Sequence, residues 1–372
     1  MQFETLSIKI TQQHDANAGA VATPIYLSST FERDADGTFP HGHIYSRTSN
    51  PNRNTLEKTY AAIEGGEVGI AFASGQAATA TVFQCLQPND HVILPSDSYH
   101  GTPALMQEIM TRWGLSFSKV DMTNLDELKA AFQPNTRLVW IETPSNPLLK
   151  IIDIQAVADL VRQNNAVSVC DNTWATPVIQ RPLELGCDVS MHSATKYFGG
   201  HSDLLSGALI FKENNEFAER ARKIQALGGA VPSPFDCWLI LRGIKTLALR
   251  VRQQAENANL LAHYLTKHPK VEKVWYPWLE SHQGYELAKR QMTAGGAMLS
   301  VQIKGGIEAA MAVAAKTQLF TRATSLGGVE SLIEHRASVE GINSKTPQNL
   351  LRISIGIEHI DDLISDFEQA LG

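Results

Sequence analysis

One lysine and one aspartate stand at the ends of two strand-like segments, where their side chains could do chemistry together. Lys196 follows a short apolar run that leads into the hydroxyls of Ser193 and Thr195, and Asp171 closes an earlier apolar run. This set suits pyridoxal phosphate: the lysine attaches to the aldehyde, the aspartate pairs with the pyridinium nitrogen, and the hydroxyls hold the phosphate. A lysine after a strand is usually only a solvated turn residue, so the prediction rests on the whole set in this order.

The phosphate of such a cofactor needs several donors, and a second segment offers candidates. Residues 73–77 follow a strand-like run and open a helical one. The backbone N–H groups of Gly75 and Gln76 at that helix N-terminus are placed to cradle an anion. An ordinary glycine-containing turn between a strand and a helix would have the same pattern. The prediction that this segment binds phosphate therefore depends on the presence of the lysine segment.

The elements that must position these residues alternate between strand and helix from residue 55 onward. The strands are nearly continuous apolar runs, which indicates a mostly parallel α/β sheet covered on both faces. Such sheets bind ligands beyond the carboxyl ends of their strands, where the candidate residues lie. The predicted strands are 68–72, 91–95, 115–120, 137–141, 166–170 and 207–211, and the predicted helices are 56–63, 77–86, 103–113, 125–132 and 154–163.

The length of 372 residues favours two domains and an additional segment. Residues 1–55 are broken by proline and glycine and are predicted to form an irregular arm with little core of its own. Residues 56–235 are predicted to form the cofactor-binding domain, and residues 236–372 a smaller α+β domain. A helical pattern over 237–268, with few breakers apart from Gly243, is predicted to bridge the two. The smaller domain has predicted strands at 271–276, 297–303 and 350–355 and helices at 307–315 and 361–371.

Composition excludes several classes of protein. Hydrophobic residues are 43% and charged residues 19%, as in a globular chain, and the net charge of −6 argues against a general nucleic-acid binder. The four cysteines form no C-x-x-C pair, so no zinc or redox motif is indicated and no metal is predicted. No signal peptide and no apolar run of spanning length is found, so we expect a cytoplasmic protein without a membrane partner.

The segment Ser193-Ala-Thr-Lys196-Tyr-Phe-Gly-Gly-His-Ser-Asp203 resembles the Cys/Met-metabolism, or trans-sulfuration, family of pyridoxal-phosphate enzymes. The resemblance covers nearly the whole chain. It implies a fold-type-I, aspartate-aminotransferase-like architecture, in which the central sheet is the middle of a three-layer sandwich. It also implies a homotetramer of two dimers with active sites shared between subunits. The family usually has Met at the position of Gln76, but a contact there is largely through the backbone.

The resemblance also assigns roles to residues outside the lysine segment. Tyr45 and Arg47, in the arm, would reach the phosphate of the neighbouring subunit, where a guanidinium gives planar bidentate recognition. Tyr45 would also border the substrate. Tyr99 would stack on the pyridine ring and help to move protons.

Four further residues are implied to form the substrate-binding part of the site. Asn146 would contact the cofactor's phenolic oxygen or the substrate carboxylate, and Glu142 would support the site. Arg352 is a charge inside a strand pattern and needs an anionic partner if it is buried. The family uses this arginine to bind the substrate α-carboxylate, and it places Ser325 near the same carboxylate and the catalytic lysine.

The choice of bond to be broken is less clear from the sequence than the cofactor. We favour γ-elimination or γ-replacement, as in cystathionine γ-synthase or γ-lyase, although γ-acting members often carry Glu where this chain has Thr324. The residues after Tyr99 lack the Cys typical of methionine γ-lyases, and the loop at Ser325 lacks the aromatic residues typical of β-lyases. Cystathionine β-lyase or cysteine desulfhydrase, methionine γ-lyase and O-acetylhomoserine sulfhydrylase stay open as alternatives. An aminotransferase on the same fold is the alternative from a different class.

Overall fold

The computed structural model describes residues 1–12, 15, 18–341 and 346–372. Its central sheet has seven strands in the order β1-β7-β6-β5-β4-β2-β3. β7 runs antiparallel to both of its neighbours, and the other pairs are parallel, so the predicted mostly parallel sheet is confirmed. The strands are β1 (Val68–Phe72), β2 (His91–Pro95), β3 (Ser116–Val120), β4 (Thr136–Glu142), β5 (Val167–Asp171), β6 (Val189–His192) and β7 (Gly207–Phe211).

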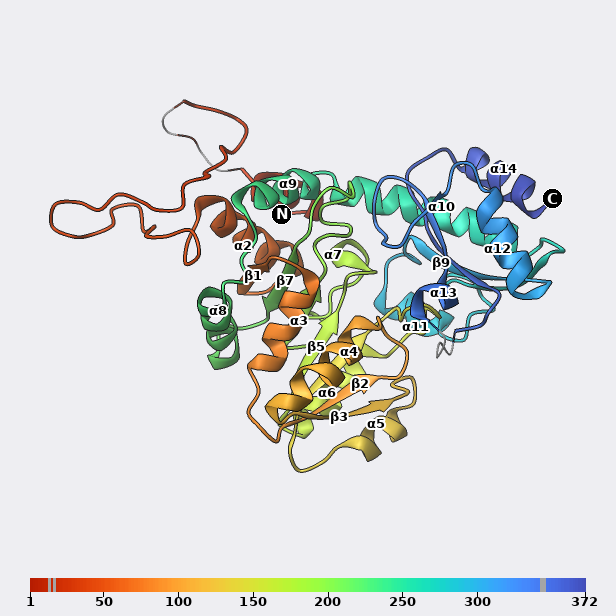
Figure 1. Cartoon of the computed structure of the whole chain (residues 1–372), viewed down its shortest axis with the longest axis horizontal. Helices are drawn as coiled ribbons and strands as arrows, with labels where there is room; N and C mark the ends of the chain where they lie inside the picture. The colour runs from red at the N-terminus through yellow and green to blue at the C-terminus, as the bar shows by residue number, and fades with distance from the viewer. Residues whose placement is uncertain (13–14, 16–17, 342–345) are drawn as a thin grey trace.

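Helices cover both faces of this sheet and make it the middle of three layers (Figure 1). Alternate residues of each buried strand point to opposite faces, so each layer has its own apolar core. One layer holds α3 (Gly75–Gln84), α4 (Gly101–Glu108) and α8 (Glu216–Gly228). The other holds α2 (Pro51–Glu64), α5 (Leu125–Ala131), α6 (Ile154–Gln163), α7 (Thr176–Ile179) and α9 (Pro234–Ile244). A 3-10 turn, η1 (Met110–Trp113), follows α4.

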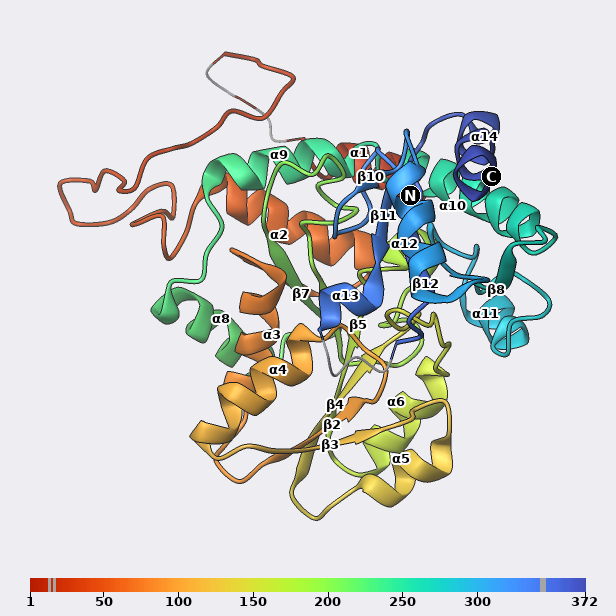
Figure 2. The ribbon, with the colours of Figure 1, turned by 45° about the vertical axis from the view of Figure 1, so that its right-hand side comes forward.

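A second sheet of five strands lies in the C-terminal part of the chain, in the order β10-β11-β12-β9-β8. Helices α10, α12 and α14 lie beside it (Figure 2), and their apolar residues share a core with its strands. Its strands are β8 (Val271–Trp275), β9 (Met298–Ile303), β10 (Thr321–Arg322), β11 (Leu332–His335) and β12 (Leu350–Ser354). Its helices are α10 (Leu247–Leu265), α11 (Tyr285–Gln291), α12 (Gly306–Lys316), α13 (Arg336–Glu340) and α14 (Ile360–Leu371).

The helical pattern predicted over 237–268 is confirmed, and it is divided between two helices. α9 ends at Ile244 and α10 starts at Leu247. The buried side of α9 packs in the same core as α2, whereas α10 runs from that core to the second sheet (Figure 1). Among the described residues, no helix is both long enough and apolar enough to cross a membrane.

The N-terminal segment is largely without regular structure, as predicted, and extends away from the body in Figures 1 and 2. Two helices nevertheless touch it: α1 (Phe3–Lys9) and the start of α2. The side chain of Asn50 caps α2 by accepting from the N–H groups of Asn52 and Arg53, and Pro51 fits the first helical turn. The predicted boundaries of arm and domains stay a prediction.

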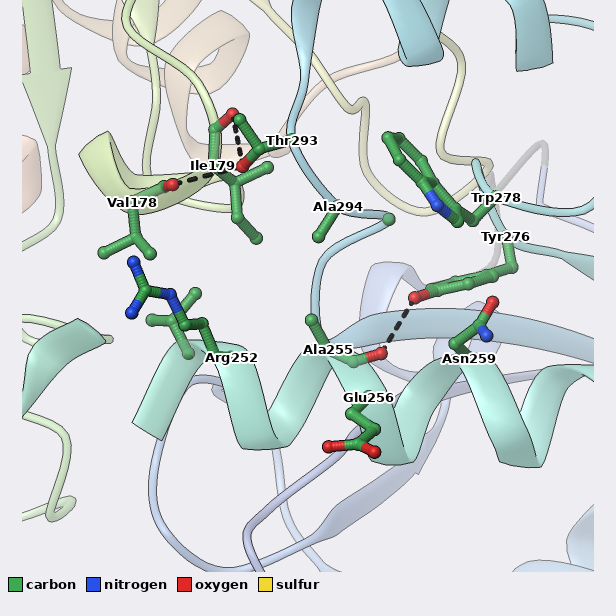
Figure 3. Close-up of a pocket in the computed structure, with 12 residues that line it drawn as sticks. Val178, Ile179, Arg252, Ala255, Glu256, Asn259, Tyr276, Trp278, Thr293 and Ala294 are labelled. Atoms are coloured by element: carbon green, nitrogen blue, oxygen red, sulfur yellow. Dashed lines mark hydrogen bonds between the residues drawn. The ribbon is translucent and has the colours of Figure 1, made fainter. Parts of the chain in front are cut away.

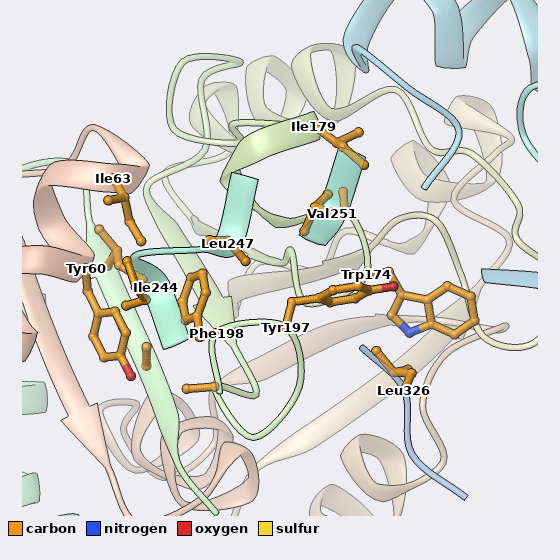
Figure 4. Packing of buried hydrophobic residues seen from close by; sticks show 14 of the residues in the cluster. Tyr60, Ile63, Trp174, Ile179, Tyr197, Phe198, Ile244, Leu247, Val251 and Leu326 are labelled. Carbon is orange, nitrogen blue, oxygen red and sulfur yellow. The ribbon is translucent and has the colours of Figure 1, made fainter. Parts of the chain in front are cut away.

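The loop after β6 is held by one of the apolar cores. Tyr197 and Phe198, the two residues after Lys196, are each 2% exposed. Figure 4 shows Phe198 beside Tyr60 and Leu247, and Tyr197 beside Trp174. The rings of Tyr60 and Phe198 stack at 5.3 Å between centroids. The backbone that carries Lys196 is therefore fixed by buried aromatic packing.

Candidate active site

The predicted site residues converge on one cavity of about 270 Å³ at the carboxyl ends of the parallel strands. Side chains from the loops after β2, β4, β5 and β6 meet the start of α3 and two segments of the C-terminal domain there. All predicted residues line it except Tyr45 and Arg47. They are Gly75, Gln76, Tyr99, Glu142, Asn146, Asp171, Ser193, Thr195, Lys196, Ser325 and Arg352.

Lys196 presents a buried amine at the centre of this cavity. Its Nζ donates a hydrogen bond to Ser325 Oγ at 2.6 Å. Burial, and then the nearby guanidinium of Arg352, lowers the pKa of Lys196 to about 8. Ser325 has a φ of 95°, a left-handed conformation that is strained for a residue other than glycine. The protein therefore holds a strained serine against an amine that loses its proton readily.

Asp171 and Glu142 form a pair of buried carboxyl groups on neighbouring strands. The two residues are direct partners in the parallel pairing of β4 with β5. Thr173 donates to Asp171 Oδ1 through its backbone N–H at 3.0 Å and its hydroxyl at 2.5 Å. Burial raises the pKa of Asp171. Burial, and then the charge of Asp171, raises the pKa of Glu142 well above its usual range.

The start of α3 forms a narrow cradle beside the lysine loop. A Cβ placed on Gly75 would lie 3.0 Å from Ser193 Cβ and 3.1 Å from its hydroxyl, so a glycine is needed for this approach. The Gln76 side chain donates to the Gly101 carbonyl at 3.0 Å, so its backbone N–H is the group left for an anion. The Thr195 hydroxyl bonds to both the carbonyl and the N–H of Ser206 and also lines the cavity.

Arg352 brings a buried guanidinium from β12 into the lining of the same cavity. Its Nη1 lies 3.4 Å from Asn146 Oδ1, and its Nη2 donates to the Ser325 carbonyl at 3.0 Å. Glu334 Oε1 lies 2.7 Å from the same Nη2. Burial lowers the pKa of Arg352 to about 10, so the group stays charged near neutral pH. A cation at this position can hold an anionic group of a ligand.

Tyr99 offers an exposed aromatic ring over the cavity, with 39% of the residue accessible. Both carboxyl oxygens of Glu142 lie 2.9 Å from its backbone nitrogen and accept its N–H. Glu142 thus fixes the backbone that carries the ring. This contact is a physical basis for the supporting role that the family resemblance implied for Glu142.

Several residues of the site were not anticipated from the sequence. Thr173, Trp174, His100 and Arg336 all line the cavity. Thr173 sits two positions after Asp171, and a hydroxyl at that spacing is a local signal that could have been recognised. No local pattern marks His100 and Arg336, because they meet only through the folded chain.

Tyr45 and Arg47 are not brought to the cavity of their own chain. The Arg47 guanidinium lies 5.8 Å from the Tyr45 ring, and Arg47 Nη1 donates to the Ala226 carbonyl at 2.6 Å. Tyr45 is 47% exposed. Neither residue lines the cavity, so within one chain their predicted role is not fulfilled.

The residues of the cavity fit pyridoxal phosphate. The cradle at Gly75, where a Cβ would collide with Ser193, leaves room for a phosphate against backbone N–H groups. Asp171 supplies a carboxylate for a pyridinium nitrogen, and Lys196 supplies an amine of lowered pKa for an aldehyde. Tyr99 supplies a ring face for stacking. The phosphate, the ring nitrogen, the aldehyde and the ring face of the cofactor thus each have a chemically matched partner.

A second, larger cavity of about 440 Å³ lies between α7, α10 and the segment around residues 276–295 (Figure 3). None of the predicted site residues lines it. Arg252 at its rim pairs with Glu4, and the Tyr276 hydroxyl already donates to the Ala255 carbonyl at 3.2 Å. Because the predicted site residues gather in the smaller cavity and none lines this one, we place the candidate active site in the smaller cavity.

Comparison with known proteins supports the same assignment. The family described as Cys/Met metabolism PLP-dependent enzyme matches residues 4–372. The chain is 48% identical to cystathionine gamma-synthase of Mycobacterium tuberculosis, over 99% of this chain and 96% of that protein. It is 45% identical to cystathionine beta-lyase of Coxiella burnetii, over 99% and 97%. The crystal structure of metB from Corynebacterium glutamicum superposes with a TM-score of 0.96 at 45% identity, covering 100% of this chain and 98% of that one.

Fold and site together define a fold-type-I enzyme that depends on pyridoxal phosphate. Within that class, the chain belongs to the Cys/Met metabolism family of PLP-dependent enzymes. The predicted family, fold class and cofactor are confirmed.

Proposed function

We propose that the protein catalyses γ-elimination or γ-replacement on a sulfur amino acid or an activated homoserine, as a cystathionine γ-synthase or γ-lyase. The observation that carries this proposal is the convergence of Lys196, Ser325 and Arg352 in one cavity of a family member. The similarity to a cystathionine gamma-synthase over 99% of the chain supports it. The proposal also assigns the cofactor and substrate roles to the residues predicted for them.

The mechanism follows from what the side chains can do. When bound, the cofactor supplies an electron sink for the negative charge that develops at the substrate α-carbon. Arg352 and Asn146 bind the α-carboxylate and so fix the α-carbon near Lys196. Lys196 Nζ removes the α-proton, and its lowered pKa gives a useful fraction of neutral amine near neutral pH.

For γ chemistry, a second proton must leave the β-carbon before the γ-substituent departs. Lys196 Nζ is the amine in position for this proton too, and its hydrogen bond to Ser325 Oγ orients it over the substrate. Addition of a thiol to the γ-carbon then gives a synthase. Release of the product as an enamine, which water hydrolyses to 2-oxobutyrate and ammonia, gives a lyase. Asp171 keeps the pyridine nitrogen protonated throughout, with Thr173 orienting its carboxylate.

The second candidate is β-elimination, because a relative with 45% identity is named cystathionine beta-lyase. β-Elimination needs only the α-proton transfer, which the same residues support. The two candidates differ in their products from cystathionine. Cysteine and 2-oxobutyrate indicate γ-cleavage, and homocysteine and pyruvate indicate β-cleavage.

The test is a product assay with the PLP-loaded protein. Cystathionine alone is one substrate, and O-acylhomoserine with cysteine is the other, with Lys196→Ala as the control. We expect cystathionine from the second mixture or 2-oxobutyrate from the first. Pyruvate as the main product would replace the proposal by β-elimination. No product from either substrate would overturn both candidates.

The proposal extends to assembly and location. The exposed arm and the position of Arg47 support a homotetramer of two dimers, in which residues 1–55 of one subunit complete the site of another. We also propose that the protein acts in the cytoplasm.

A further inference from the structure

Arg336 is a buried cation that the proposed mechanism does not use. Its side chain is only 2% exposed, and it opens the short helix α13. A positive charge in the first turn of a helix opposes the helix dipole, and burying a guanidinium carries a large desolvation cost. Two carboxylates offset this cost, and the position of the arginine in the wall of the candidate cavity suggests a further role.

The guanidinium of Arg336 touches three partners on two sides. Nη1 lies 2.9 Å from Glu334 Oε1, and Nε lies 2.8 Å from Glu340 Oε1. Nη2 faces His100 Nδ1 across the cleft between the domains at 3.5 Å. Arginine can only donate, so this contact requires His100 Nδ1 to be the acceptor.

Glu334 connects Arg336 to the substrate-binding arginine. The same oxygen, Oε1, lies 2.7 Å from Arg352 Nη2. One carboxylate oxygen thus lies within ion-pair distance of two guanidinium groups.

His100 connects Arg336 to the stacking tyrosine. The rings of His100 and Tyr99 lie 4.8 Å apart at an interplanar angle of 59°. This tilted contact restricts the orientation of the Tyr99 ring, which has no other aromatic neighbour at this distance among the described residues.

We propose that Arg336 is a positioning residue that couples the substrate-carboxylate anchor Arg352, through Glu334, to the Tyr99 ring, through His100. We call Arg352, Glu334, Arg336, His100 and Tyr99 the contact chain. The inference rests on the proposed function only for the roles of its two ends. The contact chain crosses the cleft between the domains. Closure of the domains around an amino acid and placement of the Tyr99 ring therefore both depend on the Arg336 guanidinium.

The first test measures the pKa of His100 in the absence of substrate. Burial, and then the charge of Arg336, lowers the pKa of His100; Glu340 and Glu334 oppose this, and Arg352 adds to it. We expect NMR titration of the apoprotein, with the signal assigned by His100→Phe, to show a higher His100 pKa in Arg336→Met than in wild type. Arg336→Lys keeps the charge and should keep the pKa low.

The matched control is Arg290→Met. Arg290 also forms an ion pair between the two parts of the chain, with Asp153 at 2.6 Å, but away from the cavity. This variant should leave the pKa of His100 and both affinities described next unchanged. An unchanged His100 pKa in Arg336→Met would overturn the contact between Arg336 and His100.

The second test separates the two ends of the contact chain by affinity. The probes are PLP, titrated into the apoprotein, and L-homoserine, whose hydroxyl is a poor leaving group, titrated into the loaded protein. Arg336→Met should weaken both affinities by about threefold or more. His100→Phe should weaken PLP binding and leave L-homoserine binding unchanged. The double variant should bind PLP no worse than the single variant that binds it more weakly.

If the double variant lost PLP affinity by the product of the two single-variant factors, the two residues would act independently. That result would contradict the coupling. Arg336→Lys covers the case in which Arg336→Met does not fold. A lysine cannot bridge Glu334 and His100 together, so L-homoserine binding should still weaken in this variant. Wild-type affinity for L-homoserine in Arg336→Lys would overturn the proposal. Failure of the proposed function would give a different result from failure of the coupling. No sulfur amino acid would then be turned over, but the affinities for PLP and L-homoserine would still change in the variants as described.

Discussion

At the scale of the residue, Lys196 differs from an ordinary lysine because its amine is buried beside a guanidinium. Its pKa is lowered to about 8, and the neutral amine is the form that reacts with an aldehyde. The rate at which PLP attaches to the apoprotein should therefore rise as pH increases through about 8 and level off above it.

Stopped-flow absorbance in the visible range measures this rate. Arg352→Ala removes a cation that lowers the pKa of Lys196, so the rise should move to higher pH in that variant. A rate that keeps rising to about pH 10, as for a free lysine, would contradict the buried amine.

The carboxyl pair gives a second prediction at this scale. The raised pKa of Glu142 indicates a neutral group beside Asp171, and an amide imitates a neutral carboxyl. We expect Glu142→Gln to keep kcat/KM within about threefold, because Gln retains an acceptor for the Tyr99 N–H. Asp171→Asn should lower it by about a hundredfold or more, since the charge opposite the pyridinium is lost. Equal losses in the two variants would show that both carboxylates act as anions.

Residue types and order were enough to predict most of the residues that line the candidate cavity, and the reason is local. Asp171 ends a strand, Lys196 and Gly75 each follow one, and parallel strands end at one edge of a sheet. The contact of Arg336 with His100 spans 236 positions in the sequence, and no periodicity or spacing encodes it. Such residues become visible only when the two domains are folded against each other.

At the scale of the element, the start of α3 must approach the lysine loop closely. Gly75→Ala would place a methyl group 3.0 Å from the Ser193 Cβ, tighter than ordinary packing. We expect the affinity for PLP to fall by about tenfold or more, with a smaller change in melting temperature of the apoprotein.

Gly228→Ala is the matched control, because a Cβ there meets no atom within 4 Å. It lies at the end of α8 and should leave PLP affinity unchanged. Unaltered binding in Gly75→Ala would mean that the phosphate does not sit in this cradle.

Element boundaries followed the sequence closely where apolar runs were short and bounded by turn residues. β1, β2 and β7 match their predicted ranges. Gly243 was recognised as a breaker beside the end of α9, but the position of the break itself was not predicted, because residues 245–246 carry no proline or glycine. The antiparallel direction of β7 was also not predictable, since a buried strand has the same apolar pattern in either direction.

At the scale of the whole molecule, the arm is the part of the chain that a single subunit does not explain. Val21 is 82% exposed and Leu27 is 72% exposed, although each would normally be covered. Arg47 carries phosphate-binding chemistry and yet lies outside the cavity of its own chain. A second subunit that covers the arm and receives Arg47 would account for both observations.

Complementation between inactive subunits tests this shared site. Arg47→Ala and Lys196→Ala should each be inactive, because one lacks a phosphate donor and the other the reactive amine. If Arg47 acts on the neighbouring subunit, a hybrid dimer contains one site with both residues intact and one with neither. Co-assembly of equal amounts should restore roughly a quarter of wild-type activity, since half of random dimers are hybrids with one of two sites intact. Mixed assemblies, identified by different affinity tags, that stay inactive would place Arg47 in the site of its own chain or outside any site.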